Sequence, residues 1–203
     1  MVIDWMEDYK KIRVERTETN GKKELIIHNP TSLKLIGEGS QGAVFQLSED
    51  RCVKIYVNPD AAIKEGKALE AASNTHRVPN VYEVGPNYVI MDYLKGMNLK
   101  DYLKKAKTIP VSFTKQIILI RKELKRVGFT RIKTSIGHFI ITEGDVLKAI
   151  DHSDGLTKND PYNPKMFRDL KNLGLLDTFL KQAKEIDPES YEDWQKNIDF
   201  NRL

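Results

Sequence analysis

The sequence has little cysteine, no long apolar run and no signal-like start. Cys52 is the only cysteine among 203 residues, which excludes an intramolecular disulfide and a cysteine-cluster metal site and is usual in a reducing compartment. No apolar run approaches the length of a membrane span, and Asp4, Glu7 and Asp8 stand where a secretory signal needs basic residues. We therefore expect a cytoplasmic protein without a membrane anchor.

The excess of one sign of charge over the other is also small. The 33 Lys and Arg exceed the 29 Asp and Glu by only four, and acids are interleaved with bases nearly everywhere. Charge alone therefore gives no reason to expect a nucleic-acid partner, which stays open as a third class of function. With 31% charged and 40% hydrophobic residues, the composition is that of a folded globular protein.

Alternating patterns predict a mostly antiparallel sheet in the first half of the chain, with Asn20-Gly21 as a hairpin turn. The expected strands are residues 11–16, 24–28, 33–36, 43–47, 52–57, 81–84 and 88–92. One helix over residues 61–73 interrupts them, because Glu65, Ala68, Leu69 and Ala72 form a single stripe at helical spacing.

The second half changes to helical periodicity. We expect helices over residues 99–106, 112–127, 164–173 and 175–186, a last helical segment after 187–188, and a hairpin of residues 139–142 and 146–150. Asn98 and Ser112 are expected N-caps. The basic run 121–126 is expected to be a solvated helix face, and Trp194 to pack in the last helix. The fold class is α+β, with a β-rich part at 1–93 and an α-rich part at 94–203.

One glycine-rich stretch, Gly37-Glu38-Gly39-Ser40-Gln41-Gly42-Ala43-Val44, has a recognisable chemistry. Glycines at this spacing let backbone N–H groups approach phosphate oxygens without a Cβ in the way. In a dinucleotide-binding fold the third glycine would open a helix. Here residues 43–47 are typical of a strand, so the loop is expected over a β-hairpin.

Lys54 and Glu65 follow this loop in an order that phosphoryl transfer uses. A lysine in an apolar strand is by itself an ordinary edge or solvent-facing residue. Glu65 lies on the same stripe as Leu69 in the helix over residues 61–73, and an ion pair with Lys54 would direct the lysine towards phosphates.

At these residues the sequence resembles the protein kinase superfamily. Cys52-Val53-Lys54 takes the place of the family's Ala-x-Lys, Glu65 that of the helix C glutamate, and residues 88–96 that of the fifth strand and hinge. The resemblance implies that ATP is bound by the loop, the strand lysine and the hinge, namely by Gly37, Gly39, Ser40, Gly42, Val44, Cys52, Lys54, Met91, Asp92 and Leu94.

The resemblance extends to Asp151, which follows the hairpin that delivers the metal-binding aspartate and would hold Mg²⁺. Beyond it the chain has no Ala-Pro-Glu motif, and a Pro-containing stretch runs quickly into the last helices. This is similar to the RIO-type atypical kinases and to small bacterial kinase-like proteins. The implied architecture is bilobal, with a reduced helical C-lobe that lacks an activation segment, and Lys54, Glu65 and Asp151 as its catalytic residues.

The catalytic loop departs from the family pattern. Aligned on the strand at 139–141, Lys133 stands at the position of the catalytic Asp, and His138 at that of the metal-holding Asn. A lysine cannot replace the carboxylate base, whereas His138 could in principle bind a metal beside Asp151. A second register, His152 to Asn159, also satisfies the catalytic-loop motif. The motif requires a strand after the Asn, however, and the prolines that follow Asn159 cannot form one.

Two hypotheses follow. The first is a pseudokinase or impaired serine/threonine kinase that binds ATP and acts as a regulatory module for a protein partner. The second is an active phosphotransferase, on protein Ser/Thr or on a small molecule, with a non-standard catalytic loop, since positioning and electrostatics supply most of the catalysis of phosphoryl transfer.

Overall fold

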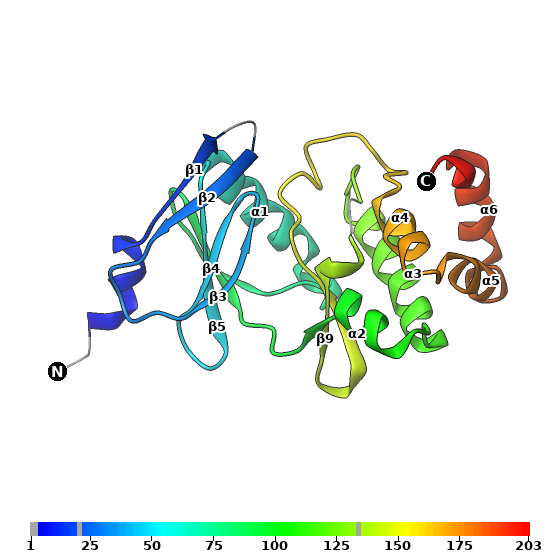
Figure 1. The fold of residues 1–203 in the computed structure, drawn as a ribbon, viewed down its shortest axis with the longest axis horizontal. Coiled ribbons are helices and arrows are strands. Elements are labelled where there is room, and N and C mark those ends of the chain that lie inside the picture. Colours follow the sequence, from blue (N-terminus) through cyan, green and yellow to red (C-terminus); the bar gives the residue numbers. More distant parts are fainter. Residues whose placement is uncertain (1–3, 20–21, 133–134) are drawn as a thin grey trace. The chain divides into compact units, whose positions relative to one another are not determined.

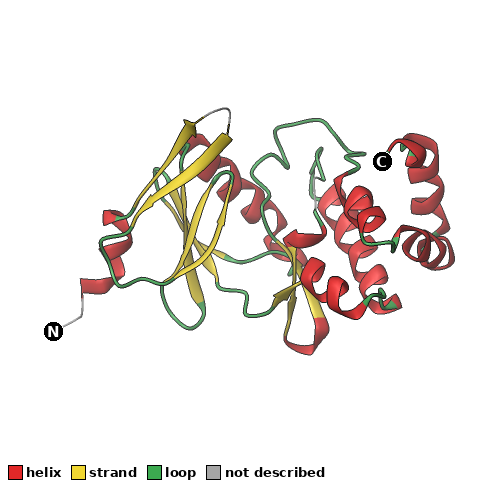
Figure 2. Ribbon diagram, viewed as in Figure 1, coloured by secondary structure: helices red, strands yellow, loops and turns green. Residues whose placement is uncertain are grey.

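The computed structural model describes residues 4–19, 22–132 and 135–203, and its strands and helices confirm the α+β class (Figure 1). The chain divides into two compact units, one of Met1–Glu70 with Pro79–Tyr93, the other of Ala71–Val78 with Leu94–Leu203. Figure 2 shows that most strands belong to the first unit and most helices to the second.

The first unit contains a five-stranded antiparallel sheet with the order β3-β4-β5-β7-β6. Its strands are β3 (Leu35–Gly39), β4 (Gly42–Gln46), β5 (Arg51–Tyr56), β6 (Val81–Val84) and β7 (Tyr88–Asp92). β1 (Arg13–Thr19) and β2 (Lys22–His28) form a separate two-stranded sheet, so the strands expected in one sheet form two. The Asn20-Gly21 turn lies outside the described residues.

One face of the five-stranded sheet makes the core of this unit. Phe45, Val53 and Ile55 are buried in a cluster with Tyr9 and Ile12 from the N-terminal segment. Because successive side chains of a strand point to opposite faces, the residues between them on β5 lie on the other face of the sheet. That second face carries Cys52 and Lys54.

Helix α1 (Pro59–Ala72) has the stripe expected from its spacing, with Glu65, Ala68 and Leu69 buried. The Asn58 side chain accepts a hydrogen bond from the Asp60 backbone N–H at 3.0 Å. Such a bond satisfies one of the backbone donors that a helix leaves without a partner in its first turn, so the local sequence fixes where α1 begins.

The second unit is mainly helical. Its helices are α2 (Leu99–Ala106), α3 (Val111–Arg126), α4 (Lys165–Asn172), α5 (Leu176–Ile186) and α6 (Pro188–Asn197). β8 (Met97–Asn98), β9 (Phe139–Thr142) and β10 (Val146–Ala149) form a small antiparallel sheet of order β10-β9-β8. Short 3-10 helices lie at Asp4–Lys11, Ser73–Thr75, Ile136–His138, Glu143–Asp145 and Phe200–Arg202.

Of the two expected N-caps, one is confirmed. The Asn98 side chain accepts from the Asp101 N–H at 2.9 Å and caps α2. Ser112 is not a cap, because α3 begins one residue earlier, after Pro110, whose φ of −61° already suits the helix entry. The buried apolar residues of α3, among them Phe113, Ile117, Ile120 and Leu124, recur at helical spacing.

The expectation of a solvated basic face on α3 is wrong for Arg121, which is only 5% exposed. It stands four residues after Ile117 and three before Leu124, so helical geometry turns it towards the same interior. Trp194 is buried as expected, against the rings of Phe167 and Phe179.

No helix among residues 4–19, 22–132 and 135–203 combines the length and apolar character needed to cross a membrane.

Candidate functional site

The glycine-rich stretch forms a β-hairpin. β3 and β4 pair antiparallel up to Gly39 opposite Gly42, with Ser40 and Gln41 in the turn between them. A Cβ on Gly42 would overlap the Ile55 carbonyl, so only glycine fits at that point of the sheet. A Cβ on Gly39 would meet no heavy atom within 4 Å, so the exposed tip of the hairpin has open space beside it.

The second face of the sheet gathers several residues that the sequence assigns to nucleotide binding. Val44 lies opposite Lys54 across β4 and β5, and Cys52 lies opposite Met91 across β5 and β7. Residues in register across neighbouring strands share a face, and so do residues two apart on one strand. Val44, Cys52, Lys54 and Met91 therefore share one face, and Gly37 pairs with Val44 at its edge.

Lys54 and Glu65 are brought together as the sequence predicts. Lys54 Nζ lies 3.8 Å from Glu65 Oε2, with 12% of the lysine side chain and 2% of the glutamate side chain exposed. Lys54 Nζ also lies 4.8 Å from the centroid of the Tyr56 ring. A buried carboxylate is costly unless a cation accompanies it, so this pair couples the position of α1 to that of β5.

Cys52 is held as a neutral thiol next to the last residue of β7. Burial, assisted by the charge of Asp92, raises the pKa of Cys52 to about 12. Its Sγ donates to the Asp92 carbonyl oxygen at 3.5 Å. The Asp92 carboxylate accepts hydrogen bonds from Asn80 and Tyr82, so its side chain anchors the strand end. Leu94 begins the second unit.

In the second unit, the two residues predicted to bind metal lie side by side. His138 Nε2 is 3.6 Å from Asp151 Oδ2, and both side chains are partly exposed. The Ile150 N–H donates to the His138 carbonyl at 2.9 Å, which holds the two segments together. Asp151 has a φ of +68°, a left-handed conformation that is uncommon outside glycine.

The chemistry of these donors suits a hard cation only in part. Mg²⁺ takes oxygen ligands, usually one or two carboxylates together with substrate phosphates, and Asp151 fits that role. Imidazole suits softer metals, so His138 fits better as a partner of the Asp151 carboxylate than as a second ligand. Within the described part of the chain, no group of three or more His, Cys, Asp or Glu side chains could hold a metal ion.

Sequence reasoning missed the residue that holds the loop before His138. Asp169 of α4 is buried, and its Oδ2 accepts from Ser135 Oγ at 2.5 Å and from the Ile136 N–H at 3.2 Å. Lys100 Nζ lies 3.8 Å from its other oxygen. Ser135 and Asp169 are 34 residues apart, and no local pattern connects them.

A second set of contacts ties Arg131 to the chain after Asp151. Arg131 NH1 is 3.0 Å from Asp154 Oδ2, and Arg131 Nε is 3.5 Å from Asp160 Oδ2. Lys133, which the alignment places at the catalytic Asp, lies outside the described residues. Residues 156–164 contain turns and a single β-bridge at Asp160 but no strand, which counts against the alternative register ending at Asn159.

Three known proteins are similar to parts of this chain. "Putative serine/threonine-protein kinase YrzF" of Bacillus subtilis (strain 168) is 25% identical over 138 residues, which cover 65% of this chain and 64% of that protein. "Probable serine/threonine-protein kinase CPE1738" of Clostridium perfringens (strain 13 / Type A) is 29% identical over 140 residues, 59% of this chain and 20% of that protein. "Mitogen-activated protein kinase kinase 2" of Arabidopsis thaliana is 31% identical over 109 residues, 46% of this chain and 30% of that protein.

No family model matches the sequence. The chain spans less than two thirds of the length of each of these relatives. All three are named as kinases, and two of the names specify serine/threonine kinases. At this modest identity, the similarity supports placing the chain in a protein kinase-like superfamily.

Proposed function

We propose that this protein binds ATP through the glycine-rich hairpin and the second face of the sheet, and Mg²⁺ through Asp151. In this proposal the two compact units are the two lobes of a kinase-like fold. The observation that carries it is the Lys54 and Glu65 pair at 3.8 Å, on the sheet face that also carries Val44, Cys52 and Met91. A lysine held in this way has donors for phosphate oxygens.

The residues fit a nucleotide in three respects. The tip of the hairpin leaves open space beside Gly39, where backbone N–H groups can approach phosphates. Cys52 and Met91 offer neutral, buried side chains to an aromatic base. The Asp92 carbonyl stands at the end of β7, where the resemblance to kinases implies contact with a donor on that base. Mg²⁺, when bound, would neutralise the charge of the phosphates, and Asp151 is the carboxylate that would hold it.

We further propose that the protein is a pseudokinase or an impaired serine/threonine kinase. The sequence places Lys133 where a carboxylate would accept the proton of the substrate hydroxyl, and an ammonium group has no lone pair for that proton. His138 stands where an amide oxygen would hold a second metal ion. Its position beside Asp151 supports a role in orienting that carboxylate.

The short Pro-containing stretch between Asp151 and α4 favours a RIO-type arrangement within the superfamily. The same resemblance favours a protein as partner or substrate. The single cysteine favours a cytoplasmic location. The second candidate is an active phosphotransferase. It is favoured by the hydrogen bonds with which Asp169 fixes the loop before His138, because a positioned loop can support catalysis without the usual base.

Thermal unfolding tests nucleotide binding. ATP with Mg²⁺ at about 100 times its dissociation constant adds about 2.7 kcal/mol of stability, which in a chain of this size raises the Tm by about 5 °C or more. Lys54→Met and Asp151→Asn should each reduce the shift, whereas Lys67→Met, at an exposed position of α1, should leave it unchanged. A parent protein whose Tm does not respond to the nucleotide would refute the proposal.

Transfer of labelled γ-phosphate separates the two candidates. A pseudokinase leaves itself and generic protein substrates no more labelled than an Asp151→Ala control. Robust labelling above that control would make the protein an active phosphotransferase. A nucleic-acid function would instead appear as RNA binding that weakens steeply between low and high salt, and binding without that salt dependence would count against it.

A further inference from the structure

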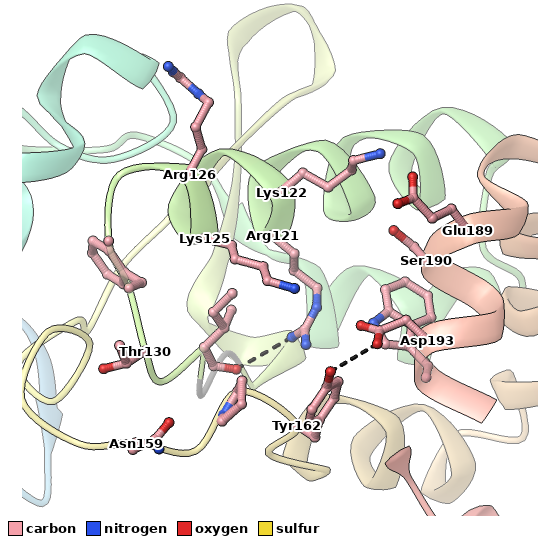
Figure 3. Close-up of a pocket in the computed structure, with 15 residues that line it drawn as sticks. Arg121, Lys122, Lys125, Arg126, Thr130, Asn159, Tyr162, Glu189, Ser190 and Asp193 are labelled. Carbon is pink, nitrogen blue, oxygen red and sulfur yellow. Dashed lines mark hydrogen bonds between the residues drawn. The ribbon is translucent and has the colours of Figure 1, made fainter. Parts of the chain in front are cut away.

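The second unit contains a cavity of about 760 Å³ that the nucleotide proposal does not use. It lies between the C-terminal half of α3, the chain around Phe129 and Ile132, the turn at Pro161 and Tyr162, and α6 (Figure 3). Its volume is within the range of small-molecule sites in proteins. None of the residues that line it belongs to those proposed for ATP or Mg²⁺.

Arg121 is the unusual residue of this cavity, because it is a nearly buried cation that forms no ion pair within 4.0 Å among the described residues, and only the more distant charge of Asp193 opposes its burial. Among the described residues its NH1 makes one long hydrogen bond, 3.4 Å to the Ile132 carbonyl, and its guanidinium faces the rings of Phe167 and Trp194 at 5.8 and 5.7 Å. A guanidinium carries five N–H donors. Burial lowers its pKa to about 10, so Arg121 is still a cation at neutral pH.

A second cation points the same way. Figure 3 shows Arg121 and Lys125, one helical turn apart on α3, both extending towards Tyr162, whereas Arg126 extends away from the cavity. Lys122 is occupied by an ion pair with Asp187 at 2.9 Å. The α3 side of the cavity therefore carries two positive groups, Arg121 buried and Lys125 exposed.

The acidic groups across the cavity offset this positive charge only in part, because the charge of Asp193 raises the pKa of Arg121 by less than burial lowers it. Asp193 of α6 accepts from the Tyr162 hydroxyl at 2.9 Å and from Asn197 Nδ2 at 3.2 Å. Glu189 lies one turn earlier on α6. No carboxylate of the described residues comes within ion-pairing distance, 4.0 Å, of Arg121 or Lys125. The cations outnumber the acids along the lining, and two of them face inward.

We propose that this cavity binds a small organic anion, with a phosphate or carboxylate group on Arg121 and Lys125 and an apolar or aromatic body against Phe129 and Trp194. A buried cation without an ion-pairing partner in direct contact is costly, and an anionic ligand would supply one. The flat fork of a guanidinium matches both oxyanions, and Trp194 offers a large surface to a ring. The binding does not depend on ATP, so the two proposals can fail separately.

Tryptophan fluorescence gives a local test. The chain has two tryptophans, so a Trp5→Phe background leaves Trp194 as the only reporter. Phenyl phosphate is the first probe, benzoate distinguishes a carboxylate from a phosphate ligand, and inorganic phosphate and phenol each carry only half of the proposed chemistry. Arg121→Met and Lys125→Met remove the two cations in turn. Arg168→Met, at an exposed position of α4, is the matched control.

We expect phenyl phosphate or benzoate to change the Trp194 emission with a dissociation constant at or below about 1 mM. Arg121→Met should weaken binding by about tenfold or more, because a charge-assisted hydrogen bond is lost, and Lys125→Met by less. Arg168→Met should match the parent. Because Lys125 is exposed, its variant keeps the fold even where Arg121→Met does not.

Three results would overturn the inference. One is the absence of a saturable change in Trp194 emission with either aromatic anion up to about 10 mM, which would mean that the cavity does not bind them specifically. Another is binding that both Arg121→Met and Lys125→Met leave unchanged. The last is equal affinity for phenol and phenyl phosphate, which would show that the anion contributes nothing.

Discussion

The pair formed by Lys54 and Glu65 makes the sharpest prediction about stability. Replacing Lys54 with Met leaves the Glu65 carboxylate, whose side chain is only 2% exposed, without this cation. Breaking a buried pair from one side costs about 3 kcal/mol or more of the free energy of unfolding. We expect about 3 kcal/mol for Lys54→Met, and about 2 kcal/mol for Glu65→Leu because the more exposed lysine can reach water.

The double variant should lose no more than the worse single one. At 3.8 Å the gross attraction in an effective dielectric of about 20 is about 4 kcal/mol, and desolvation offsets part of it. With a double variant that costs about 2 kcal/mol, the coupling energy of the cycle is about 3 kcal/mol, at the upper end for contacting residues.

Hydrogen exchange followed by mass spectrometry measures this locally. Because the chain has two units, a global melt can mix their transitions, whereas peptides from β5 and α1 report the opening free energy around the pair. Lys67→Met on the exposed side of α1 is the control for removal of a lysine. Losses that add within about 0.5 kcal/mol would refute the reasoning, because they would mean that the two charges do not interact.

Three further results are expected. Gly42→Ala should lower the free energy of unfolding in urea by about 2 kcal/mol or more, because its Cβ would overlap the Ile55 carbonyl. Gly39→Ala should change that free energy by no more than about 0.5 kcal/mol, since its Cβ would have open space. Equal effects of the two variants would contradict this. Burial raises the pKa of Cys52 to about 12, so in the folded protein at pH 8 the thiol should react with iodoacetamide at least about a thousandfold more slowly than in the urea-unfolded protein. Mass spectrometry measures both rates. Similar rates in the two states would contradict the burial of this thiol. Asp187→Asn should cost about 0.5 kcal/mol at pH 7, because the ion pair with the exposed Lys122 is lost while asparagine still caps α6. Burial raises the pKa of Asp187, but hydrogen bonds outweigh it and lower that pKa, so the difference in stability from the parent should shrink as the pH falls from about 4 through the lowered pKa. A difference in stability that grows in acid would contradict this.

Local pattern predicted those features whose cause is local. The strands β6 and β7 follow from short apolar alternation between turns, and α1 from a stripe at helical spacing. Asn98 caps α2 because a side chain reaches a backbone donor only three residues away. β8, with two residues, has no periodicity of its own and exists because β9 pairs with it.

The candidate site divides in the same way. Lys54 and Glu65 could be paired in advance because the glycine-rich loop, the strand lysine and the helix glutamate occur in the order that phosphoryl transfer uses. Asp169 could not, because its partner Ser135 is distant in the chain and only tertiary packing brings them together. Arg121 carried a signal in its spacing from Ile117 and Leu124, but its charge favoured a solvated position.

Isothermal titration of ATP with Mg²⁺ into the parent and into the Lys54→Met/Glu65→Leu double variant tests the central claim most directly. The double variant removes the charge proposed to hold phosphate while avoiding an unpaired buried carboxylate, so its loss of binding cannot be ascribed to unfolding if its hydrogen exchange matches expectation. We predict saturable binding to the parent and an affinity at least about tenfold lower for the double variant. Absence of binding to the parent, or equal affinities for both proteins, would contradict the proposed nucleotide site.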